Sequence, residues 1–85
     1  MQWTFETTGP DLRLEISDAA DLEALRIALG DPVWLLGATW EALYTNEFKR
    51  GRFQDALGAW LARRDGAEVA DVLQAAGVTA RIEST

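Results

Sequence analysis

The sequence predicts an α+β domain, in which a three-stranded antiparallel sheet carries about four helices packed on one face, in the order ββααααβ. Two observations support this fold class. Apolar and polar residues alternate in two short runs near the start and in one near the end, as in half-buried strands. Between these runs the apolar spacing changes to three and four residues, which is typical of helices with one buried face. With 85 residues, we expect residues 1–85 to form a single compact domain.

The first two strands are expected at residues 2–7 and 12–16, joined by a hairpin loop at residues 8–11 that is rich in turn-forming residues. The third is expected at residues 78–83. Because an isolated hairpin is only marginally stable, we expect this last strand to complete the sheet. The apolar residues that would face the core from the first two strands are Trp3, Phe5, Leu12, Leu14 and Ile16.

The first helix is expected between Asp18 and Gly30. The carboxylate of Asp18 suits an N-cap, and glycine adopts the left-handed conformation that ends many helices. Asp31 and Pro32 predict the start of a second helix, because proline fits the first turn, where no N–H is needed. The apolar face of this second helix would consist of Val33, Leu36, Trp40, Leu43 and Tyr44.

Residues 45–52 are mostly polar and predict a break in the chain, with Gly51 as the residue that stops the helix. A third helix is expected at residues 53–61. Asp65, followed by a glutamate three residues later, matches the capping box that begins a fourth helix. Gly77 is the expected end of that helix.

The chain contains no histidine and no cysteine. It therefore lacks the usual general base, the thiol nucleophile and the commonest metal ligand. The nearest carboxylate pairs at helical spacing are Asp18 with Asp21 and Glu68 with Asp71. Both pairs fall in first turns of predicted helices, where negative charge is favoured, so we interpret them as capping groups. We expect no enzymatic activity, no cofactor and no metal site; an enzyme that uses paired carboxylates is the alternative.

No run of residues approaches the ~18 apolar residues of a membrane span, and the start lacks the form of a signal peptide. We therefore expect a cytoplasmic protein. The net charge of −6 and the sequence pI of about 4.4 argue against direct binding to nucleic acid or to anionic lipid. A protein partner with a basic surface fits this charge better.

Charge is sorted along the chain. Residues 1–47 carry nine acidic and two basic side chains, whereas residues 48–64 carry five basic and one acidic. The acidic half is a candidate binding surface, and solubility is the competing explanation. The candidate partner-binding residues are Asp11, Glu15, Asp18, Asp21, Glu23, Asp31 and Trp34.

Four tryptophans are many for this length. Trp3, Trp40 and Trp60 take the inward phase of their predicted elements, so we expect them in the core. Trp34 lies off the apolar face of the second helix. It is either an exposed anchor for a partner or part of a central helix that is buried on two sides.

The leading hypothesis is a small acidic, non-enzymatic protein-binding module. In its sharper form it is an inhibitor whose carboxylates take the place of phosphates in a basic nucleic-acid-binding groove. It resembles, in size, charge and missing catalytic groups only, the small acidic anti-CRISPR proteins and other phage-encoded inhibitors. The alternative is a structural or assembly module, such as a homodimer, that joins the acidic half of one copy to the basic residues 48–64 of another.

Overall fold

The computed structural model describes residues 1–35 and 37–83 of the chain. The predicted fold class and the order ββααααβ are confirmed, with one additional 3₁₀ turn, η1. In chain order the elements are β1 (Gln2–Phe5), β2 (Asp11–Glu15), α1 (Ala19–Ala28), η1 (Val33–Leu35), α2 (Trp40–Thr45), α3 (Glu47–Leu61), α4 (Gly66–Ala75) and β3 (Thr79–Glu83).

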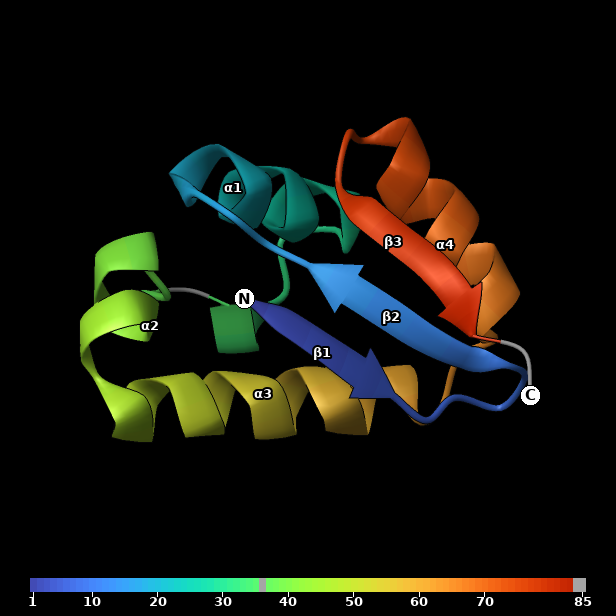
Figure 1. Ribbon diagram of the computed structural model, residues 1–85, viewed down its shortest axis with the longest axis horizontal. Helices are drawn as coiled ribbons and strands as arrows, with labels where there is room; N and C mark the ends of the chain where they lie inside the picture. Colours follow the sequence, from blue (N-terminus) through green and yellow to red (C-terminus); the bar gives the residue numbers. More distant parts are fainter. Residues whose placement is uncertain (36, 84–85) are drawn as a thin grey trace.

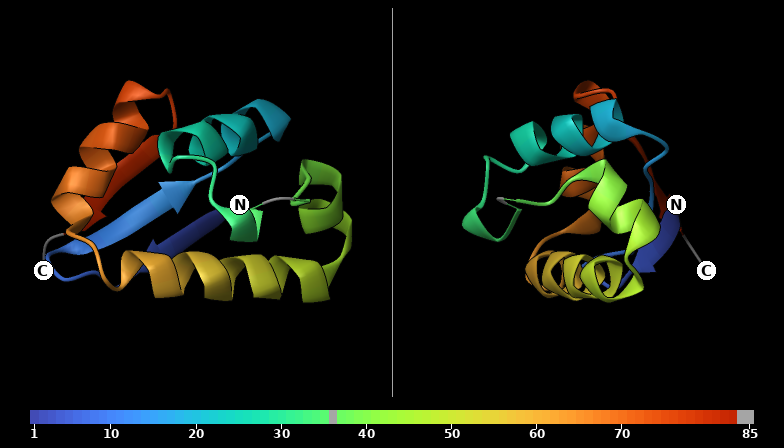
Figure 2. Two further views of the ribbon diagram at one scale, coloured as in Figure 1. Left: turned by 180° about the vertical axis from the view of Figure 1, so that it is seen from behind. Right: turned by 90° about the vertical axis from the view of Figure 1, so that its left-hand side faces the viewer.

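The strands form one antiparallel sheet in the order β1-β2-β3, with β2 in the centre (Figure 1). The helices all cover the same face of this sheet, and η1 lies on the side of the helical layer that faces away from it (Figure 2). In the register, Leu12 of β2 pairs with Phe5 of β1 and with Ile82 of β3. Because side chains alternate between the two faces, the polar residues between these positions form the open face of the sheet.

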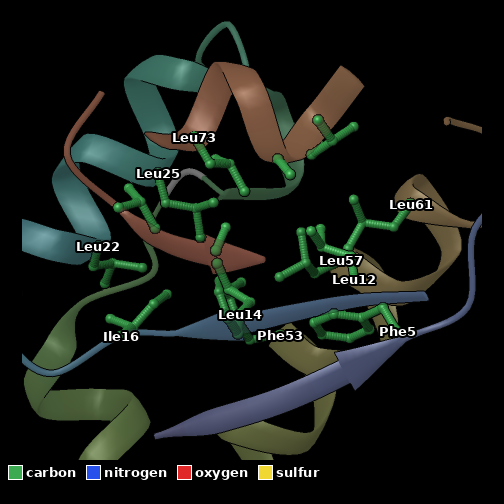
Figure 3. Close-up of a cluster of buried hydrophobic side chains, with 14 of the residues drawn as sticks. Phe5, Leu12, Leu14, Ile16, Leu22, Leu25, Phe53, Leu57, Leu61 and Leu73 are labelled. Atoms are coloured by element: carbon green, nitrogen blue, oxygen red, sulfur yellow. The ribbon is translucent and has the colours of Figure 1, made fainter. Parts of the chain in front are cut away.

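The core lies between β2 and the helices, and Figure 3 shows side chains from α1, α3 and α4 meeting the strands there. Within the described residues, no polar or charged side chain is buried. The largest fully buried side chains are Leu12, Leu14, Ile16, Leu25, Leu35, Leu43, Leu57, Leu61 and Leu73. The expectation that three tryptophans lie in the core is correct only in part, because Trp3, Trp40 and Trp60 are partly buried and pack against the core from its edge.

The single second helix predicted after Asp31 and Pro32 is wrong. Asp31 is not a cap: it has a φ of +56°, and the chain forms only the short η1 turn after it. Gly37 then adopts a φ of +83°, which an α-helix does not allow. The hydroxyl oxygen of Thr39 accepts a hydrogen bond from the N–H of Ala42 and begins α2 as a separate helix. The predicted face residue Leu36 lies outside the described residues.

The predicted break at residues 45–52 is also wrong, since α3 passes through most of it. Asn46 caps this helix by accepting a hydrogen bond from the N–H of Lys49 at 3.0 Å. Gly51 lies inside the helix and does not end it. Apolar residues such as Phe53 are buried further along, and this burial together with the cap outweighs the helix-weakening effect of one glycine.

The first hairpin differs from its prediction only at its ends. β1 stops at Phe5, and Asp11 is the first residue of β2 and not part of the loop. The caps predicted at Asp18 and Asp65 are both confirmed. In the part of the chain that the structure describes, no helix has the length and apolar character needed to cross a membrane.

Candidate protein-binding surface

The carboxyl end of α3 is held in place by the loop between β1 and β2. The N–H of Thr8 donates to the carbonyl of Arg64 at 2.9 Å. The N–H of Gly66 donates to the hydroxyl oxygen of Thr7 at 3.1 Å, across 59 positions of sequence. Thr7 in turn donates to the carbonyl of Pro10 at 2.7 Å. These bonds set the position of the α3–α4 junction relative to the sheet.

The same contact requires glycine at the start of α4. A Cβ at Gly66 would lie 2.4 Å from the carbonyl oxygen of Pro10 and 2.8 Å from the hydroxyl oxygen of Thr7. Asp65 caps α4 by accepting a hydrogen bond from the N–H of Ala67 at 2.9 Å. The α3–α4 junction is therefore closely packed against the β1–β2 loop. Its opposite side is part of the surface formed by the helices.

Two adjoining hollows open on that helical surface. The first, of about 390 Å³, lies between η1 and the second half of α3; its lining residues are Trp34, Ala56, Ala59, Trp60, Arg63 and Arg64. The second, of about 290 Å³, lies between α1, the end of α3 and α4; its further lining residues are Ala28, Leu29, Glu68, Val69 and Val72. Trp60 and Arg64 line both hollows, so we name the two together the tryptophan groove.

One side of the groove is basic. The guanidinium of Arg64 lies 4.4 Å from the centre of the Trp60 ring, within the range of a cation–π contact. Arg63 and Arg64 are exposed, and neither forms an ion pair with a carboxylate of the described residues. A guanidinium that stacks by its face keeps its N–H edge available to an acceptor. Glu68 is the acidic group among the lining residues.

An exposed aliphatic side chain lines the groove. Val72 is 49% exposed there. Apolar side chains gathered around a hollow are typical of a surface that another molecule covers.

None of the six candidate carboxylates lines the groove. Two of them act at the start of α1. Asp18 accepts a hydrogen bond from the N–H of Asp21 at 2.9 Å, and Asp21 accepts one from the N–H of Ser17 at 2.8 Å. These two side chains have a structural task as caps.

Glu23 and Asp31 both form ion pairs with Arg26. The hydrogen bond from Arg26 lowers the pKa of Glu23 below the usual range of a glutamate. The same two carboxylates raise the pKa of Arg26. A third hollow of about 220 Å³, between α1 and α2, includes Glu23 and Arg26 beside Trp40, so its charged groups are already paired with each other.

Asp11 and Glu15 lie on the open face of the sheet, where cations accompany them. Arg13 lies between them in β2 and forms an ion pair with Glu83 at 3.2 Å. Arg81 of β3 is opposite Arg13 in the register and therefore diagonal to both Asp11 and Glu15. The charge on this face is mixed.

Of the seven candidate residues, Trp34 alone lines the tryptophan groove. It is partly buried and packs against the core from the η1 turn, so it is not part of a central helix, and its role as an anchor stays a prediction. Trp60, Arg63 and Arg64 were not among the predicted binding residues, because Trp60 was expected in the core and the two arginines counted only as part of the basic residues 48–64. The spacing of Ala56, Ala59, Trp60 and Arg63 by three and four residues was the available signal of a shared helix face.

Within residues 1–35 and 37–83, no three acidic side chains lie close enough together to hold a metal ion. Comparison of the chain with protein-family models, with curated proteins and with solved structures finds no match. The surface itself must therefore support any functional conclusion.

Proposed function

We propose that this chain is a small, non-enzymatic protein-binding module that docks on a partner through the tryptophan groove. The observation that carries the proposal is the meeting of Trp34 from η1 and Trp60 from α3 in one groove that the exposed side chain of Val72 also lines. Tryptophan and arginine are the side chains most often found at the energetic centre of protein interfaces. Binding through the groove would be enough for an inhibitor, because a bound inhibitor blocks the partner's surface by occupying it.

The shape of the groove favours a protein segment as the occupant. It follows the exposed side of α3 and continues over α4. A long, open, largely apolar groove along helices suits an amphipathic segment that places side chains in it at regular spacing.

In this proposal the candidate carboxylates do not contact the partner directly. Arg26 accompanies Glu23 and Asp31, and Arg13 accompanies Asp11 and Glu15, which makes the local potential less negative at these positions. The net charge of −6 then serves solubility and the steering of encounters. The inhibitor that mimics phosphates is the competing version, and it requires contact through Asp18 and its neighbours instead of the groove.

A display selection tests the proposal. Random peptides of about 16 residues are selected against the domain, because that length spans a helical groove. The expected result is a set of binders whose affinity falls about tenfold or more with Ala59→Gln, which places a larger side chain in the groove from an exposed helix position.

The matched control is Ala20→Gln, the same change at an exposed position in the first turn of α1. It should leave binding unchanged. A second groove variant, Trp34→Ala, should weaken the same binders. The proposal is wrong if no binders are obtained, or if the binders respond to Ala20→Gln or to Asp18→Asn and not to Ala59→Gln.

A further inference from the structure

We infer that the occupant of the tryptophan groove is an acidic segment of another protein, with carboxylates for Arg63 and Arg64 and apolar side chains for the two hollows. This inference rests on the proposed function and deepens it by naming the chemistry of the partner. It also differs from the sequence-based expectation of a basic partner.

Arg63 and Arg64 are available to carboxylates of a partner. Their side chains are exposed and have no carboxylate partner among the described residues, whereas Arg13 and Arg26 do. The stacking of Arg64 on Trp60 restrains its guanidinium beside the hollow that the partner would fill. A carboxylate that binds there meets a planar, oriented donor, which is the geometry of strong bidentate pairs.

A stripe of cationic and small residues runs along α3. Four residues spaced alternately by three and four lie on one face of this helix, namely Lys49, Arg52, Ala56 and Ala59, and Arg63 follows just beyond the end of the helix. Small side chains in the middle of the stripe allow close approach of another chain. Cations lie on both sides of these small residues, Arg52 within α3 and Arg63 beyond its end, and would pair with carboxylates along a segment of matching length.

Repulsion between like charges disfavours a symmetric pair of copies as the occupant. In a two-fold dimer the same patch lies on both sides of the interface. If two copies met through Ala56 and Ala59 with their helices antiparallel, Arg52 of one copy would approach Arg63 of the other. Parallel helices would bring each cation against its own equivalent. Both arrangements bring like charges together, which disfavours association.

Among negatively charged partners, the net charge of the whole chain favours a short acidic segment over a polyanion. A domain of net charge −6 repels polyanions such as nucleic acid at long range. A short protein segment with two or three carboxylates carries much less charge than a polyanion and is repelled less. It also gains the contacts with Arg63, Arg64 and the two hollows. The basic groups of residues 48–64 then form a binding surface on an otherwise acidic protein.

The test uses the peptides from the same selection. The expected result is that groove-dependent peptides are net negative and contain aromatic or aliphatic residues. Their affinity for the double variant R63Q/R64Q should fall about tenfold or more, and it should fall with rising salt between about 50 and 500 mM, because the charges are exposed. The matched control is Arg81→Gln, an exposed cation on the open face of the sheet, which should change the affinity less than about twofold.

The other possible results separate a failure of this inference from a failure of the proposed function. Groove-dependent peptides that are neutral or basic, or that bind R63Q/R64Q as well as the unchanged domain, overturn this inference but leave the proposed function standing. A selection without groove-dependent binders overturns the proposed function itself. Light scattering that shows a dimer, dispersed by Ala59→Gln, would assign the groove to a second copy and reject the acidic partner.

Discussion

Arg64 stacks on the ring of Trp60, with its guanidinium carbon 4.4 Å from the ring centre. The two residues lie four positions apart, one in α3 and one just after its end. Trp60 is partly buried and Arg64 is exposed, so the pair borders the core and belongs to the surface. Changes to Arg64 should therefore affect binding more than folding.

Replacing Arg64 with glutamine should lower the free energy of unfolding by about 0.5–1 kcal/mol, because an exposed cation–π contact is lost. It should also shift the indole N–H resonance of Trp60. Urea unfolding and the NMR spectrum of the indole protons measure the two effects. Arg63→Gln is the comparison, since Arg63 forms no cation–π contact with a ring of the described residues. Equal effects of the two variants would show that the stacking contributes nothing.

Replacing Gly66 with alanine should destabilise the domain by about 1–3 kcal/mol, because the new methyl group would overlap the carbonyl oxygen of Pro10. The hairpin loop and the α3–α4 junction would have to separate to make room. Chemical unfolding gives the free energy. Hydrogen exchange at the N–H of Thr8 should become faster, and an unchanged rate there would mean that the strain is taken up elsewhere.

Replacing Gly51 with alanine should have the opposite effect and stabilise the domain by about 0.5–1 kcal/mol. This glycine lies inside α3 with helical backbone, and a Cβ there would have no atom beyond its own helix within 4 Å. Thermal unfolding measures the gain. A loss of stability would indicate that the helix does not pass through residue 51.

The pair of Glu23 and Arg26 predicts a change of stability in acid. The folded-state pKa of Glu23 is lowered from 4.5 by the hydrogen bond from Arg26. Its stabilising effect is therefore fully present above pH 4.5 and is lost as the pH falls through the lower folded-state value. Unfolding curves between about pH 2 and 7 should show a smaller acid loss for Glu23→Gln than for the unchanged chain. Parallel curves for the two proteins would argue against this ion pair.

The sheet and the helix caps were predictable because they depend on local patterns. The alternation of Leu12, Leu14 and Ile16 defines one face of a strand whatever lies against it. Asp18 and Asp65 cap helices through bonds to residues two or three positions away. The second helix failed as a prediction because Gly37 takes a left-handed conformation that outweighs the helical spacing of its apolar neighbours.

The tryptophan groove could not be predicted in the same way. Trp34 and Trp60 belong to different elements, and only tertiary packing brings them to one hollow. The periodicity of α3 placed Trp60 towards the core, but its large ring extends from the core to the edge of the groove. The grouping of acidic residues in the sequence likewise did not predict that the fold places Arg13 and Arg26 beside acidic side chains.

The central position of β2 has a consequence for synthesis in the cell. Its second neighbour, β3, comes much later in the chain, as the 70 positions between Arg13 and Glu83 show. Until β3 has left the ribosome, one edge of β2 presents unpaired backbone groups to the surroundings. Nascent or prematurely terminated chains would thus be prone to pair with other strands and aggregate, a hazard that ends when β3 occupies that edge.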